Sequence, residues 1–190
     1  LSFVDNFNYT DQQQTFRYAI KANTTEGTSP EIQTGVTLGT LYTVPFEESY
    51  ANMQYYTNPW NSTLLTGYNC SWSVTDIEYN TSVYPYDEDR GMLKVYKWND
   101  DDAVAQSEII SPKVSLADAI NPHLSFYIYH YNNITEKNTL TVYISVDDNE
   151  KQPLGKPIKI EATEAGGVKY SYSLYDFADA NDISITFLGE

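Results

Sequence analysis

The chain lacks the residue sets that mark several common kinds of protein. One cysteine, Cys70, excludes an internal disulfide framework, and two histidines with that cysteine do not form a spaced set of zinc ligands. No G-x-S-x-G motif marks a serine hydrolase, and no apolar run approaches the roughly 18 residues that span a membrane. Lys and Arg number 11 against 26 Asp and Glu, and this net charge of −15 makes nucleic acid and anionic lipid poor partners. We therefore expect no nucleic-acid binding and no membrane insertion.

The composition is typical of a β-sheet protein. Aromatic residues make up 15% of the chain, and 18 of them are Tyr. A pleated, half-buried surface favours Tyr, Thr, Val, Ile and Phe. The sequence contains no long apolar stripe with the 3.6-residue period of a helix. Short apolar runs recur at near-regular spacing with turn residues between them. This arrangement predicts an all-β, antiparallel β-sandwich with little helix.

The first 39 residues predict a β-hairpin. Phe16, Tyr18 and Ile20 alternate along one face, the polar turn "NTTEG" follows, and the alternation resumes at Ile32. On the strand "FRYAIKAN" and the turn "EGTS", residues 1–39 resemble the C-terminal strands of a fibronectin type III repeat. They cover less than half of such a repeat, which needs about seven strands to bury its own core. We therefore expect the hairpin to pack on the rest of the chain or to pair at its edge with a neighbouring chain or domain, burying Phe16, Tyr18 and Ile20.

A second unit begins at Leu41. Residues 41–190 resemble the jelly-roll domain of bacterial surface adhesins, the cleaved-adhesin or choice-of-anchor type related to MAM domains. The segments that carry the resemblance are, in order, "PFEES", "SWSV", "SEIISPKVSL", "HLSFYIYHY" and "NTLTVYISVDD". The resemblance implies an antiparallel jelly-roll β-sandwich. It also implies a further closing strand after "ISITFLG", so that strand is expected to be missing or supplied from elsewhere.

Two prolines mark the most specific part of this resemblance. Pro112 lies inside the run "IISPKVSL", and because proline cannot donate to a strand ladder, we expect a local break there, at a sheet edge or where the strand switches sheets. Pro122 precedes "HLSFYIYHY" and favours an extended start for that strand. On that strand Leu124, Phe126 and Ile128 are expected to share one face.

The carboxylates do not follow a glycosidase pattern. Jelly-roll glycosidases need two Asp or Glu at a fixed separation across a cleft, but the strand-borne E-x-D-x-E signature is absent, and the acidic clusters "YDEDR", "NDDDA" and "VDDNE" fall in predicted turns. We expect no enzyme activity, with a divergent glycosidase as the remaining alternative.

Calcium is one interpretation of these carboxylates, because it takes six to eight oxygen ligands and accepts loop geometry. Related jelly rolls hold a structural calcium near the first strand, and the resemblance implies Glu47 of "PFEE" and Asp76 after "SWSV" as ligands. Asp147 and Asp148, which end a predicted strand, are further candidates. The alternative is that all four are turn carboxylates that bond the backbone and solvent.

Aromatic residues in polar loops are the second kind of candidate. Four such residues lie in or beside predicted polar loops that contain Asp or Asn: Trp60, Tyr84, Tyr86 and Trp98. Such rings stack on sugars while neighbouring carboxylates bond hydroxyl groups. The alternative is that these rings cover the edge of the core, with their polar ends in water.

These features predict a non-catalytic adhesion or carbohydrate-binding module of a secreted or surface-anchored bacterial protein, located outside the cell or on its surface. Its partner is expected to be a glycan or a host surface protein. The lone cysteine argues against a eukaryotic extracellular module, which usually carries paired cysteines. The alternative from another class is a structural spacer domain in a multidomain surface protein.

Overall fold

The computed structural model describes residues 4, 6, 12–50, 59–67, 70–76, 91–97, 105–129, 138–161 and 167–190. Strands and turns dominate this part of the chain, and its one helical element is a single 3₁₀ turn, η2 (Tyr175–Phe177). Within it, every strand pair is antiparallel except the short pair of β5 and β10. The prediction of a mostly β, mainly antiparallel fold is confirmed. No helix among the described residues has the length and apolar character to cross a membrane.

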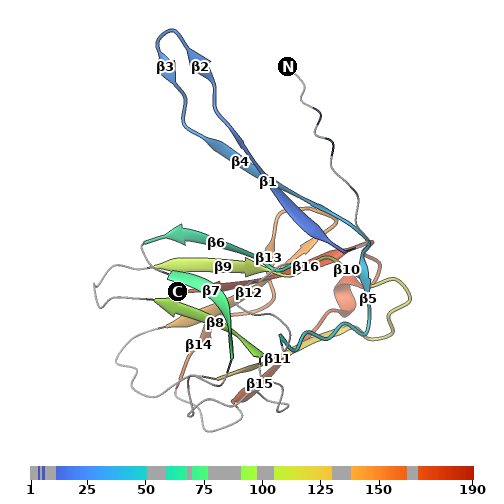
Figure 1. Cartoon of the computed structure of the whole chain (residues 1–190). Helices are drawn as coiled ribbons and strands as arrows, with labels where there is room; N and C mark the ends of the chain where they lie inside the picture. Colours follow the sequence, from blue (N-terminus) through green and yellow to red (C-terminus); the bar gives the residue numbers. More distant parts are fainter. Residues whose placement is uncertain are drawn as a thin grey trace.

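One large sheet forms the centre of the molecule (Figure 1). Its neighbouring strands are, in spatial order, β6 (Asn61–Thr66), β9 (Gln106–Ile110), β16 (Ile183–Gly189) and β12 (Thr139–Val146). Two short strands, β13 (Gln152–Pro153) and β14 (Ile158–Lys159), pair with β12. At the other end of β16, β10 (Val114–Ser115) pairs with it and also, in parallel, with β5 (Tyr42–Thr43).

The alternation of β12 and β16 puts their aliphatic and aromatic side chains on one face of this sheet. Val142 pairs with Phe187 and Ile144 with Ile185, and these four side chains are at most 8% exposed. The opposite face is also covered, since Thr186 is 1% exposed. Burial on both faces explains why β16 is rich in residues that suit a packed sheet interior.

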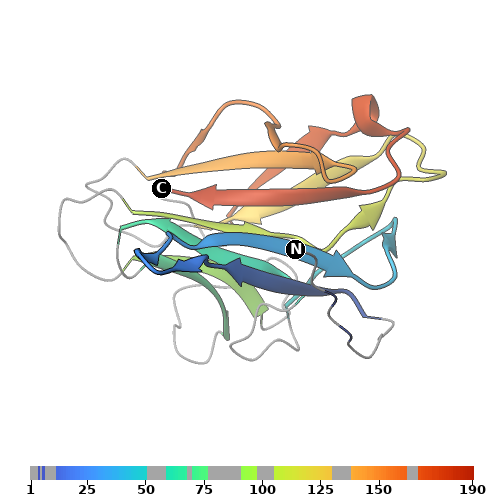
Figure 2. The same ribbon diagram turned by 90° about the horizontal axis from the view of Figure 1, so that it is seen from above.

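A second layer packs on the aliphatic face. It consists of two two-stranded sheets, β7 (Cys70–Asp76) with β8 (Gly91–Lys97) and β11 (His123–Ile128) with β15 (Val168–Ser173). The ring of Phe126 on β11 meets Phe187 edge-on at 5.0 Å between centroids. Val95 on β8 lies against Gly189, where an added Cβ would be 3.2 Å from the valine. The core of the protein lies between these two layers (Figures 1 and 2).

The predicted break at Pro112 is confirmed. β9 ends at Ile110, β10 starts at Val114, and Pro112 lies between them. The Ser111 hydroxyl accepts a hydrogen bond from the Ile185 amide at 2.9 Å, and the Ser111 amide donates to the Ile185 carbonyl at 2.8 Å. The serine thus keeps this part of β16 bonded beside the proline. The predicted place of this break is wrong. β9 lies between β6 and β16, and β9 and β10 both pair with β16 in the same sheet, so Pro112 marks neither a sheet edge nor a switch between sheets.

The predicted N-terminal hairpin is present and projects from the body (Figure 1). β1 (Gln14–Ile20) pairs with β4 (Ile32–Leu38), and the tip is formed by β2 (Asn23–Thr24) and β3 (Gly27–Thr28). Phe16 and Tyr18 are partly buried, but Ile20 is 64% exposed and Ile32 is 71% exposed. The expectation that the rest of the chain would bury Ile20 is therefore wrong. Pairing of the hairpin with a neighbouring chain or domain stays a prediction.

Candidate functional site

The carboxylates proposed as calcium ligands do not form a cage among the described residues. Glu47 is exposed in the loop after β5, and Asp147 and Asp148 form the turn after β12. Asp76 is the last residue of β7, and its side chain lies outside the described part. The described residues contain no group of three or more His, Cys, Asp or Glu side chains placed to hold a metal ion.

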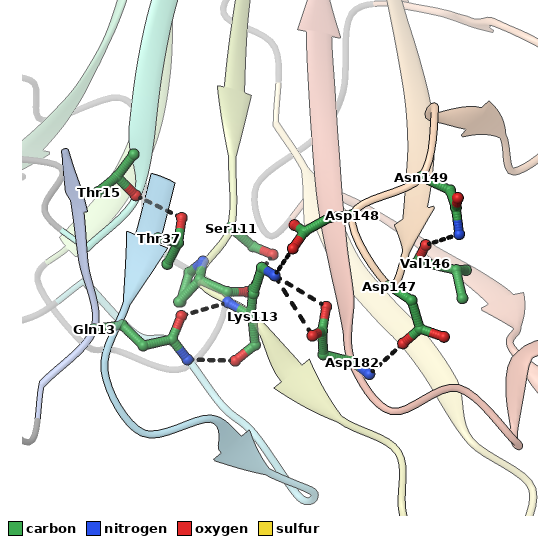
Figure 3. Close-up of polar contacts among 11 residues, drawn as sticks. Gln13, Thr15, Thr37, Ser111, Lys113, Val146, Asp147, Asp148, Asn149 and Asp182 are labelled. Carbon is green, nitrogen blue, oxygen red and sulfur yellow. Dashed lines mark hydrogen bonds and ion pairs between the residues drawn. The ribbon is translucent and has the colours of Figure 1, made fainter. Parts of the chain in front are cut away.

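The turn at Asp147 and Asp148 is instead engaged in contacts within the protein (Figure 3). The Lys113 ammonium lies 2.6 Å from the Asp148 carboxylate and 3.4 Å from that of Asp182. An Asp147 carboxylate oxygen accepts a hydrogen bond from the Asp182 amide at 3.1 Å. Both turn residues have positive φ, 48° and 61°, a conformation that Asp tolerates better than most residues. These contacts favour the interpretation of the two residues as turn carboxylates.

The same lysine fastens the hairpin to the body. The Gln13 side chain is 2% exposed, accepts a hydrogen bond from the Lys113 amide at 2.7 Å and donates to the Lys113 carbonyl at 2.5 Å. The side-chain amide of Gln13 therefore pairs with both the backbone N–H and the backbone carbonyl of Lys113, as a neighbouring strand would. Lys113 joins the hairpin through its backbone and the acidic turn through its ammonium, and Figure 3 shows both sets of contacts.

A second contact lies further along the hairpin. The Arg17 guanidinium donates to the Ser62 carbonyl at 2.7 Å and to the Thr63 hydroxyl at 2.8 Å, and it also bonds the Asn61 side chain. In the antiparallel register, Arg17 and Ile20 lie on opposite faces of the hairpin, because successive side chains alternate. The side chain that reaches β6 is thus on the polar face. On the opposite face Ile20 and Ile32 are exposed, whereas Phe16 and Tyr18 are partly buried.

Of the four candidate aromatic residues, the structure describes only Trp60. It is 7% exposed, and its ring stacks on Phe187 at 6.3 Å and lies 5.6 Å from the ring of Tyr50. For Trp60 the structure therefore favours the alternative that the ring covers the core, since a platform for a sugar must be open to solvent. Tyr84, Tyr86 and Trp98 lie outside the described residues.

Tyr50, beside Trp60, has an unusual environment. Its burial and the nearby Glu48 carboxylate both raise the pKa of the Tyr50 phenol well above its ordinary value. A Glu48 carboxylate oxygen also accepts a hydrogen bond from the Tyr50 amide at 3.0 Å. The phenol therefore stays neutral at physiological pH, and the pair belongs to the packing of this loop.

Three loops gather at one end of the molecule, beside β5, β10 and η2 (Figures 1 and 2). The parallel pairing of Thr43 with Ser115 places the loop 44–50 next to the loop 116–122. The pairing of β11 with β15, and a 2.8 Å hydrogen bond from the Leu174 amide to the Pro122 carbonyl, bring the loop 174–182 to the same end. Loops that gather at one end of a strand scaffold are where binding residues are most often found.

These loops expose apolar side chains. Ile120 is 95% exposed, Tyr175 is 66% exposed and Val44 is 37% exposed. The first residues of two of these loops are buried and anchor them to the core: Leu116 is 1% exposed and Leu174 is 4% exposed. We call this region, formed by the exposed residues of the loops 44–50, 116–122 and 174–182, the loop-end surface.

The loop-end surface is also acidic. The three loops contain no Lys or Arg, and they contain six acidic residues: Glu47, Glu48, Asp118, Asp176, Asp179 and Asp182. Asp182 is paired with Lys113, and Glu48 bonds the Tyr50 amide. Glu47, Asp118, Asp176 and Asp179 are exposed.

Sequence reasoning missed Ile120 and Tyr175. A signal existed for Ile120, which sits in "ADAINP" among the turn-forming residues Asp118, Asn121 and Pro122. An isolated aliphatic residue inside a turn is often exposed. Nothing in the sequence shows that the loop 174–182 lies at the same end of the molecule.

Comparisons with protein-family models, with curated proteins and with solved structures find no match to this chain.

Proposed function

We propose that the chain is a non-catalytic binding module of a secreted or surface-anchored bacterial protein, engaging a glycan or a host surface protein. The loop-end surface is the observation that supports this proposal most. It presents Ile120 and Tyr175 to solvent on loops whose supporting residues are buried in the core. Exposed apolar side chains on a rigid scaffold are a common feature of interaction surfaces.

The fold that we propose for residues 41–190 is a jelly-roll β-sandwich. Its support is the packing of the β7–β8 and β11–β15 sheets on one face of the large antiparallel sheet. We also propose that residues 1–39 are the C-terminal hairpin of a fibronectin type III-like repeat, supported by the register of β1 with β4. Neither assignment by itself fixes a function, because one fold serves many functions.

A structural calcium ion, with Glu47 and Asp76 as ligands, remains part of this proposal. Removing the metal with EDTA is expected to lower the melting temperature and added Ca²⁺ to restore it, since a ligand of the folded state stabilises that state. The Glu47→Gln variant should lose the Ca²⁺ response while Glu150→Gln keeps it. Identical melting curves with EDTA and with Ca²⁺, and no metal in the purified protein, would remove calcium from the proposal.

The second candidate function is that of a spacer, and the hairpin favours it. Ile20 and Ile32 form an exposed apolar pair beside two strand edges. Exposed edges and apolar strand faces are features that pair with other strands. In this case the hairpin would join neighbouring domains and the loop-end surface would have no ligand.

The experiment that separates the two candidates is a binding survey with the whole chain. The protein is applied to a glycan array and to immobilised fibrinogen and collagen, with Ca²⁺ and with EDTA. A matched pair of variants, Ile120→Ser/Tyr175→Ser at the loop end and Ile20→Ser/Ile32→Ser on the hairpin, is tested in parallel. We expect the wild type and the hairpin variant to bind at least one of these surfaces and the loop-end variant to bind about tenfold more weakly.

Two results contradict the binding-module proposal. One is the absence of binding to every glycan and protein in the survey, and the other is binding that the loop-end variant retains in full. Release of reducing sugar from any polysaccharide would instead support the glycosidase alternative.

A further inference from the structure

We propose that the loop-end surface binds a cationic polypeptide segment that carries an apolar side chain. This inference rests on the proposed function as a binding module and specifies the chemistry of the partner. Two observations carry it, the one-sided charge of the three loops and the aliphatic character of their most exposed large apolar residue.

The charge of the surface selects a basic partner. Glu47, Asp118, Asp176 and Asp179 are exposed, and no Lys or Arg occurs in the three loops to balance them. Complementary charge favours association and fixes the choice of partner, whereas juxtaposed like charges oppose it. A second copy of this chain, whose net charge is −15, is therefore disfavoured as the occupant.

The most exposed large apolar side chain, Ile120, favours a polypeptide over a glycan as the partner. Ile120 is 95% exposed and is aliphatic, so it has no flat ring to stack on a pyranose face. An aliphatic side chain gains most from a pocket of apolar side chains, which a protein partner offers. Tyr175, 66% exposed on the loop 174–182 at the same end of the molecule, offers an amphipathic contact to the same partner.

The backbone around Ile120 is held in place before a partner arrives. Asp118 and Asn121 flank it with positive φ values of 64° and 55°, and the Ala119 amide donates to the Leu116 carbonyl at 2.9 Å. Leu116, at the start of this loop, is 1% exposed and Pro122, at its end, is buried. A loop that is already ordered loses less conformational entropy on binding.

The test uses three synthetic 12-residue peptide amides and the whole protein. The peptides alternate Lys with Leu, Lys with Ser, and Glu with Leu, and their binding is measured by fluorescence anisotropy. We expect the Lys–Leu peptide to bind, and the Lys–Ser and Glu–Leu peptides to bind at least about tenfold more weakly. Raising the salt from about 0.05 to about 0.5 M should weaken the Lys–Leu complex, because the exposed charges become screened.

Matched variants locate the site. The Ile120→Ser variant and the triple variant Asp118→Asn/Asp176→Asn/Asp179→Asn are each expected to lower the affinity for the Lys–Leu peptide about tenfold. The controls are Ile20→Ser on the hairpin and the triple variant Glu26→Gln/Glu150→Gln/Glu161→Gln, which removes the same number of exposed charges elsewhere. Both controls should change the affinity less than about twofold.

Three outcomes overturn the inference. A Glu–Leu peptide that binds as tightly as the Lys–Leu peptide removes the charge argument. An equal loss in both triple variants shows adsorption to the acidic protein as a whole. Loss of a glycan-array signal in Ile120→Ser, with unchanged Lys–Leu binding, makes the partner a glycan. In that last case the binding module stands and only its partner changes, whereas absence of all binding in the survey removes the binding module itself.

Discussion

The hairpin and the large sheet have the same two-residue alternation and very different surroundings. In the large sheet, Ile144 and Thr186 lie on opposite faces of paired strands and are 0% and 1% exposed. In the hairpin, Ile20 and Ile32 are paired with each other and are 64% and 71% exposed. Alternation therefore identifies which side chains share a face but does not identify what covers that face.

The two regions also differ in charge and in their source of stability. Residues 12–40 carry two basic and two acidic side chains, whereas residues 41–190 carry nine basic and 22 acidic ones. An isolated two-stranded hairpin is marginally stable in water. The hairpin therefore depends on its junction with the body, at Gln13, Arg17 and Gly39, while the body depends on its core.

The largest expected difference between the hairpin and the large sheet is in the free energy of unfolding that is lost when an apolar side chain is truncated. Ile144→Ala should lower the free energy of unfolding by about 2–5 kcal/mol, because it leaves a cavity in a packed core. Ile20→Ala, the same kind of truncation on the exposed hairpin face, should change it by no more than about 0.5 kcal/mol. Urea denaturation followed by circular dichroism measures both. A cost for Ile20→Ala equal to that for Ile144→Ala would show that the hairpin face is covered in solution.

A smaller difference is expected between alanine substitutions at two glycines, Gly39 and Gly27, which both have positive φ. At Gly39, with φ of +123°, an added Cβ would lie 2.6 Å from the Gln13 Cα, whereas at Gly27, with φ of +139°, nothing lies within 4 Å. Gly39→Ala should therefore lower the opening free energy of the β1–β4 amides by about 2–3 kcal/mol, and Gly27→Ala by about 1 kcal/mol. Hydrogen exchange measures this directly. Equal effects would mean that only backbone strain matters and that the junction at Gly39 has room to relax.

The third prediction removes the hydrogen bonds of the junction. Gln13→Ala removes the two hydrogen bonds between the Gln13 side chain and the Lys113 backbone. It should lower the opening free energy of the β1–β4 amides in hydrogen exchange by about 1–2 kcal/mol. Gln152→Ala, at an exposed position on β13, should leave them unchanged. Amides of β12 and β16 serve as the internal reference. Equal loss of protection in the hairpin and in β16 would show that the two regions unfold as one unit.

The smallest effect is expected at the ion pairs of Lys113. Asp148 is 77% exposed in its side chain and Asp182 is 19% exposed, so water screens the first pair more strongly. Asp148→Asn should change the free energy of unfolding by less than about 0.5 kcal/mol, and Asp182→Asn by about 1 kcal/mol. Denaturation at low and at high salt checks the order. If Asp148→Asn lowers the free energy of unfolding more than Asp182→Asn does, then the Asp148 pair holds Lys113, and with it the hairpin, more strongly than its exposure predicts.

Local properties of the sequence determined the β class, the hairpin and the break at Pro112. The alternation of Phe16, Tyr18 and Ile20 reflects the two-residue period of a strand, which holds wherever the strand lies. Proline lacks a backbone donor in every context, so the ladder had to be interrupted near Pro112. These features depend on neighbouring residues and can be predicted without knowing the rest of the fold.

Long-range packing decided the exposure of the candidate residues. Trp60 is buried because it stacks on Phe187, 127 positions further along the chain. Ile20 is exposed at the end of β1, on the face opposite to the Arg17 contact with β6. The loop-end surface exists because β5 pairs with β10 and β11 with β15, which brings three distant loops together. A side chain's chemistry is written in the sequence, but its exposure and its neighbours depend on strand pairings that only the folded chain establishes.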